Sequence, residues 1–69
     1  MPIVQIHLMD GRDDVKKRKL VAAVTDAICS SLEVEPKTVR IILSEMAPNN
    51  YSISGKLIMD QDDPFGKNK

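Results

Sequence analysis

The sequence predicts a small α/β (α+β) domain: a βαβ unit with parallel strands and a short C-terminal hairpin, assembled into an oligomer. Two stretches of alternating apolar residues, 3–9 and 38–45, are typical of strands, and an amphipathic helix lies between them. A crossover of that length makes the strands parallel and the connection right-handed. Since parallel strands need cover on both faces and one helix covers only one, the second face is expected to meet another copy of the chain.

Length and composition support assembly. A domain of this size, 69 residues, buries only about 60% of the surface that its unfolded chain exposes. Small domains are usually reinforced by disulfides, a metal or oligomerisation. A single cysteine, Cys29, excludes an internal disulfide, and one histidine, His7, far from it makes a structural zinc site improbable. Oligomerisation is the remaining remedy for a chain of which 42% is hydrophobic.

The first strand has two different faces, because its even positions are all aliphatic and its odd positions are mixed. Asp10 and Gly11 then break the run. Asp13 is a good N-cap for a helix of about five turns. The helix is expected to end at Glu35, because Pro36 disfavours helical geometry in the residue that precedes it.

The second strand places Arg40 on the face opposite to Val39, towards the side of assembly. Residues 51–58 are expected to form a short hairpin that turns near Ser54 and Gly55. Residues 1–59 would then be a single domain. Residues 60–69, almost all polar and without periodicity, are expected to be a flexible tail.

Charge and hydropathy exclude several classes of function. Ten basic and ten acidic residues give no net charge, so neither nucleic acid nor an anionic membrane is an expected partner. No stretch is long enough to span a bilayer and no secretion signal is visible, so a cytoplasmic location is expected. Motifs for serine or cysteine nucleophiles, phosphate loops and metal ligands are absent from the sequence.

Three residues are candidates for chemistry. The chain begins Met-Pro, and removal of Met1 leaves Pro2 as a secondary amine at the start of the first strand. Arg12 lies in the turn after that strand, and Arg40 lies among aliphatic residues of the second. An arginine there needs an anion or solvent. On spacing alone Arg12 could equally be a surface turn residue and Arg40 an ion-pair member, so these residues indicate an anion-binding oligomer and no more.

The opening Pro-Ile-Val-Gln-Ile-His of residues 2–7, followed by Gly11-Arg12, resembles the 4-oxalocrotonate tautomerase family, whose members run Pro-Ile-x-Gln-Ile-His and then Glu-Gly-Arg. The similarity continues through Val-Arg-Ile-Ile at 39–42, Glu-Met at 45–46 and Tyr-Ser-Ile-Ser-Gly at 51–55. It covers about residues 2–58. The family usually forms a hexamer built as a trimer of dimers, with sites shared between subunits, and a homo-oligomer of that kind is implied here.

The resemblance implies roles for particular residues. Pro2 would be the general base, Arg12 would bind a substrate carboxylate, and Arg40 of a neighbouring subunit would bind the other carboxylate and the 2-hydroxy or keto oxygen. Tyr51 stands where the family usually has phenylalanine in a hydrophobic wall. Ile53 and Met9 are the further wall candidates. Two arginines and an apolar wall disfavour an ammonium ion and so lower the pKa of the terminal amine.

The implied activity is that of a cofactor-independent isomerase. It would move a proton between oxygen and carbon of an enol or dienol dicarboxylate such as 2-hydroxymuconate, as in aromatic hydrocarbon catabolism, with no metal or other cofactor. One alternative is a proline-dependent dehalogenase or hydratase of unsaturated acids, in which Glu45 would direct water. Another is a non-catalytic paralogue kept as an oligomeric structural protein.

Overall fold

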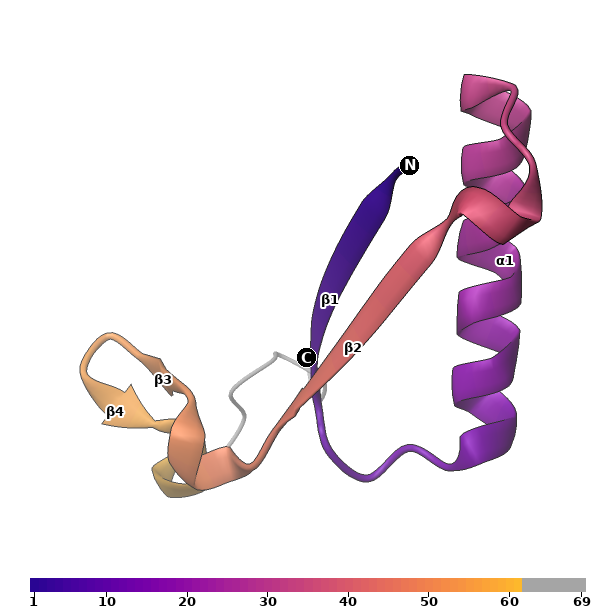
Figure 1. Ribbon diagram of the computed structural model, residues 1–69. Coiled ribbons are helices and arrows are strands. Elements are labelled where there is room, and N and C mark those ends of the chain that lie inside the picture. The colour runs from indigo at the N-terminus through magenta and orange to yellow at the C-terminus, as the bar shows by residue number, and fades with distance from the viewer. Residues whose placement is uncertain (62–69) are drawn as a thin grey trace.

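The computed structural model describes residues 1–61, which form a βαβ unit followed by a small hairpin module (Figure 1). The helix and strands in chain order are β1 (Ile3–Met9), α1 (Asp14–Leu32), β2 (Arg40–Met46), β3 (Ser52–Ile53) and β4 (Lys56–Leu57). Single 3₁₀ turns are formed by Pro36–Thr38, Pro48–Asn50 and Ile58–Asp60. Strands β1 and β2 pair in parallel and β3 and β4 antiparallel, so the predicted fold class is confirmed.

Helix α1 begins as predicted and ends earlier. The Asp13 carboxylate accepts a hydrogen bond of 2.9 Å from the backbone N–H of Lys16, which satisfies one of the free donors of the first turn. The expected end at Glu35 is wrong, because the helix stops at Leu32. Glu33 adopts the left-handed conformation (φ 56°), and its N–H donates to the Cys29 carbonyl at 3.0 Å.

The second strand is also displaced from its predicted range of 38–45. Residues 36–38 form a 3₁₀ turn in which the Thr38 hydroxyl donates to the Glu35 carbonyl at 2.7 Å. Strand β2 therefore begins only at Arg40 and runs to Met46. Pro36 begins this turn, and the first position of a helical turn accepts both the fixed φ of proline and its missing N–H. For this reason a turn forms there in place of extended chain.

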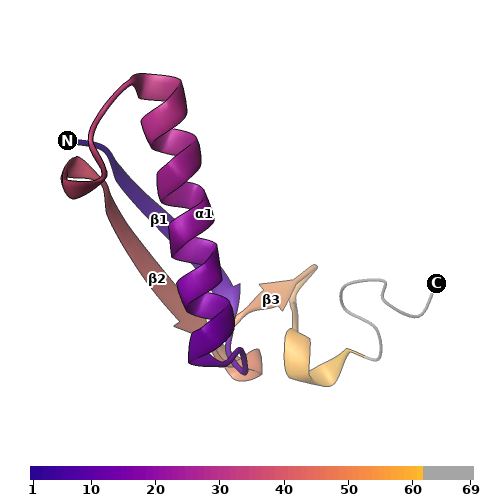
Figure 2. The same cartoon turned by 90° about the vertical axis from the view of Figure 1, so that its right-hand side faces the viewer.

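The sheet has one covered and one open face. Helix α1 lies along one side of β1 and β2 (Figure 2). On this side Lys17 of the helix and Glu45 of β2 form an ion pair of 2.8 Å. The residues of the other side include Ile3 and Ile42, which remain 60% and 52% exposed. Among residues 1–61 Ile58 alone is buried, at 5% exposure, so this part of the chain has almost no core by itself.

The hairpin module projects away from the βαβ unit (Figure 1). It turns at Ser54 and Gly55, as predicted, with φ values of 56° and 81° that fit a tight hairpin turn. The side-chain amide of Gln61 donates to the carbonyls of Lys56 (3.0 Å) and Ile53 (3.4 Å). Residues 60 and 61 therefore continue the ordered module, although the sequence placed them in the tail. The rest of that tail, 62–69, lies outside the described residues.

Candidate functional site

Two of the candidate residues lie at the amino end of the parallel strands. The Pro2 carbonyl accepts a hydrogen bond of 3.0 Å from the backbone N–H of Arg40, so the two residues are neighbours across the sheet. The Arg40 guanidinium donates to the Lys37 carbonyl at 2.6 Å and remains exposed. Met1, 77% exposed, precedes the proline, whose nitrogen is therefore an amide until that residue is removed.

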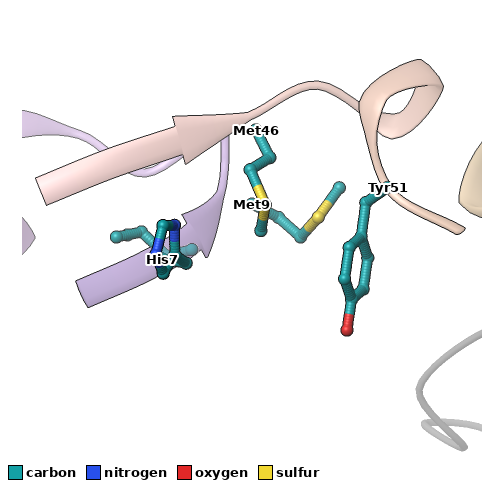
Figure 3. Close-up of a pocket in the computed structure, with 5 residues that line it drawn as sticks. His7, Met9, Met46 and Tyr51 are labelled. Atoms are coloured by element: carbon teal, nitrogen blue, oxygen red, sulfur yellow. The ribbon is translucent and has the colours of Figure 1, made fainter. Parts of the chain in front are cut away.

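A hollow of about 360 Å³ lies at the opposite, carboxyl end of the strands. Its lining residues are His7, Leu8, Met9, Met46 and Tyr51. In Figure 3 the side chain of Met9 lies between Met46 and the ring of Tyr51. The two methionines are paired in the strand register, which brings both thioethers to the same place. The wall is thus mainly apolar, with the phenol and the imidazole as its polar side chains.

Arg12 lies at the same end of β1 as the hollow, although it is not one of the lining residues. Its guanidinium donates to the Met9 carbonyl at 3.0 Å. Successive carbonyls of a strand point to opposite edges, and the Pro2 carbonyl and the Asp10 N–H both bond to β2. Pro2 and Asp10 are even-numbered positions, whereas Met9 is odd-numbered. The Met9 carbonyl therefore faces the edge of β1 away from β2, and Arg12 is anchored at that edge.

The sequence-derived site is divided within one chain. Strand β1 has seven residues, and at about 3.3 Å per residue it separates Pro2 from Arg12 by about 20 Å. Tyr51 and Met9 belong to the Arg12 end, whereas Arg40 belongs to the Pro2 end. A substrate with six carbons in a chain is less than about 10 Å long. One chain thus cannot apply both groups to the same small molecule.

Two further candidates lie outside the hollow. Ile53, expected in the hydrophobic wall, is on the hairpin, is 38% exposed and is not one of the lining residues. Glu45 is on the covered side of the sheet, where its hydrogen bond with Lys17 raises the pKa of the lysine. That carboxylate is directed at the helix and away from the hollow.

The sequence analysis overlooked three of the lining residues. His7 was considered only as a possible zinc ligand, and Leu8 and Met46 were not proposed as site residues. The alternation of β1 already placed His7 on the face shared with Met9. Placing His7 and Met46 in the wall of the hollow requires the strand register, which pairs Met9 with Met46.

Within residues 1–61 no group of three or more His, Cys, Asp or Glu side chains could hold a metal ion. Nor does this part of the chain contain a helix suited by length and hydropathy to cross a membrane.

Comparison with known proteins identifies the class. Solved structures with this βαβ-hairpin fold include a 4-oxalocrotonate tautomerase isozyme of Methylibium petroleiphilum, with a TM-score of 0.81 and 38% identity over 84% of this chain and 91% of that one. A chain of the heterohexamer 4-oxalocrotonate tautomerase of Chloroflexus aurantiacus also has a TM-score of 0.81, at 25% identity over 87% of this chain and 97% of that one.

Sequence relatives agree with the structures. The 2-hydroxymuconate tautomerase of Pseudomonas putida is 44% identical over 83% of this chain and 90% of its own length. A protein of Halalkalibacterium halodurans described as a probable tautomerase is 39% identical over 88% of this chain and 100% of its own length. The family model for tautomerase enzymes matches residues 2–61. The chain therefore belongs to the tautomerase family, and the resemblance found in the sequence is confirmed.

Proposed function

We propose that this protein is a cofactor-independent tautomerase acting on an enol or dienol dicarboxylate such as 2-hydroxymuconate, with Pro2 as its base. The observation that carries the proposal is the position of Pro2. Removal of one exposed residue frees a secondary amine at the end of β1. The backbone of Arg40 in the same chain is its neighbour across the sheet, and the Arg40 that binds substrate would come from a neighbouring subunit. The 44% identity to a 2-hydroxymuconate tautomerase supports the choice of substrate class.

The proposed reaction is a proton transfer in two steps. The Pro2 nitrogen takes the proton of the enol hydroxyl, so that the O–H bond breaks and an N–H bond forms. The electron pair left on oxygen becomes the carbonyl, and the far carbon of the conjugated system takes the proton from the ammonium. The guanidinium groups of Arg12 and Arg40 stabilise the negative charge that develops on the intermediate. A base with a pKa near the working pH is required, which a terminal amine near two cations can provide.

We propose further that the site is formed in an oligomer, a hexamer built as a trimer of dimers. Among residues 1–61 the single chain has one buried residue, an open sheet face with Ile3 and Ile42 exposed, and a projecting hairpin. The two halves of its site lie about 20 Å apart, the length of β1. Contact between copies would cover the apolar surface and bring Pro2 of one chain to Arg12 of another. The heterohexamer among the structural relatives supports an assembly of six.

The alternative reaction, hydration or dehalogenation of an unsaturated acid, is less well supported. It needs an acidic group that directs water to the substrate. The candidate, Glu45, is held 2.8 Å from Lys17 on the helix side of the sheet. The reading as a non-catalytic paralogue would hold if Met1 were retained in the cell, because an amide nitrogen is not a useful base.

The experiment compares chains that differ only at the amino terminus. Protein proven by mass spectrometry to begin at Pro2 should convert 2-hydroxymuconate, followed by ultraviolet absorbance, at a rate that rises with pH along one ionisation. Protein that retains Met1 should assemble normally and show almost no activity. Pro2→Ala, processed to a primary amine, should keep a fraction of the rate and serves as the matched control.

Two results would contradict the proposal. Full activity in protein proven to carry Met1 would exclude the terminal amine as the base. No activity in processed, assembled protein would exclude 2-hydroxymuconate as a substrate.

A further inference from the structure

The hollow beside Arg12 contains a hydroxyl that the reaction just described does not use. Tyr51 is fixed at the start of the hairpin module, where its carbonyl accepts a hydrogen bond of 2.8 Å from the Ile58 N–H. Ile58 is the buried residue of that module, at 5% exposure. The backbone that carries the phenol is therefore anchored, although the ring itself remains 38% exposed.

The surroundings leave the phenol hydroxyl available. Figure 3 shows the Tyr51 ring beside the Met9 side chain, with the hydroxyl pointing away from the two methionines. Within residues 1–61 the structure gives this hydroxyl no hydrogen-bond partner. A phenol supplies one O–H donor at neutral pH. A phenylalanine would line the same wall equally well, so packing against Met9 and Met46 does not account for the hydroxyl.

The cation next to the hollow indicates what the hydroxyl would bind. Arg12 is anchored through the Met9 carbonyl, and the Met9 side chain packs beside Tyr51. The guanidinium and the phenol therefore lie at the same end of β1, and both are donors of the kind that a carboxylate accepts. Hydrogen bonds to a carboxylate are stronger than those between neutral groups.

We propose that the Tyr51 hydroxyl is a specificity determinant, which together with Arg12 binds the carboxylate furthest from the enol and so favours dicarboxylates over monocarboxylates. This inference rests on the proposed function for the identity of the reacting end of the substrate. The discrimination itself is a property of the hollow and can be measured without turnover.

The test measures binding of two unreactive acids of equal chain length, adipate with two carboxylates and hexanoate with one, by calorimetry on the assembled protein that begins at Pro2. Wild type should bind adipate more tightly than hexanoate. Tyr51→Phe should weaken adipate binding by about tenfold or more, the usual effect of losing a hydrogen bond to a charged group, and leave hexanoate unchanged. Ser52→Ala, which removes a neighbouring hydroxyl from the hairpin, should alter neither.

Kinetics give the same comparison for the reactive substrates. With 2-hydroxymuconate, Tyr51→Phe should raise KM with little change in kcat, whereas the matched dienol with one carboxylate should show no change in either. Equal adipate binding by wild type and Tyr51→Phe, or equal losses for both acids, would overturn the inference while leaving the tautomerase proposal intact. A third outcome is that Tyr51→Phe no longer distinguishes adipate from hexanoate, while wild type does so but does not convert 2-hydroxymuconate. That outcome would support the inference and refute the proposed reaction.

Discussion

Mixing two inactive chains should restore activity, because the structure places Pro2 and Arg12 at opposite ends of β1. One partner is a blocked chain, in which an N-terminal tag keeps the Pro2 nitrogen as an amide. The other begins at Pro2 and carries Arg12→Ala. Each chain assembled alone should lack one group at every site. The arginine variant should lose on the order of 2–4 kcal/mol of transition-state stabilisation, which leaves at most a few per cent of the rate.

The expected recovery follows from the separation of the two groups. At about 20 Å apart along β1, Pro2 and Arg12 of the same chain cannot reach one substrate. A working site needs a free Pro2 from an Arg12→Ala chain and an intact Arg12 from a blocked chain. When the two chains are combined at random in equal amounts, each condition holds for half of the sites, so about one quarter of the wild-type rate per site should return.

The assay is ultraviolet absorbance of 2-hydroxymuconate after the two chains are unfolded and refolded together. Native mass spectrometry establishes that mixed assemblies formed, since the tag makes the blocked chain heavier. The control is a mixture of separately refolded chains, which should stay inactive for as long as subunits do not exchange. Mixed assemblies without recovered activity would refute the reasoning, because that result requires both groups of a site to come from one chain.

Two other substitutions examine the assembly and the hairpin. Ile42→Lys places a charge on the open sheet face, where Ile42 is 52% exposed in the single chain. It should shift sedimentation towards the monomer, because burying an unpaired charge costs several kcal/mol. The control Ser30→Lys, at an exposed position on α1, should leave sedimentation unchanged, and an intact Ile42→Lys oligomer would contradict a role for this face in assembly. Ser54→Asn should raise the free energy of unfolding by about 0.5–1 kcal/mol, since asparagine tolerates the left-handed conformation that serine adopts here at φ 56°. Denaturant titration at fixed protein concentration measures it, and an unchanged or lower midpoint would argue against this turn geometry.

The fold could be predicted from the sequence because each element had a local cause. Alternation marked β1, the Asp13 cap marked the start of α1, and Ser54 and Gly55 marked the hairpin turn. The errors were at boundaries where two local preferences competed. Pro36 was interpreted as the point where the helix ends, whereas Glu33 had already left helical geometry and the proline begins a 3₁₀ turn.

The site was harder to predict, because membership depends on register and on parts of the chain far apart in sequence. Pairing of Met9 with Met46 creates the apolar wall, and neither residue alone signals it. The opposite sides of β2 had been assigned correctly from alternation, but only the ion pair with Lys17 shows what Glu45 does there. The division between the two ends of β1 follows from strand length, and it can be calculated from the sequence, because Pro2 precedes the first predicted strand and Arg12 follows it.

The division of the site links stability to catalysis. An isolated chain exposes apolar side chains on its open sheet face and hairpin, and it has one buried residue among those described. The open sheet face carries Arg40 at its amino end, and His7 lies on it two residues before Met9 at its carboxyl end. Covering it with another copy would stabilise the fold and would also add the missing charged groups to each half-site. In a chain this small the same contacts must serve both purposes, so substitutions on the open face should alter assembly and activity together. A substitution of Tyr51, at the start of the hairpin module, should alter substrate choice and leave assembly unchanged.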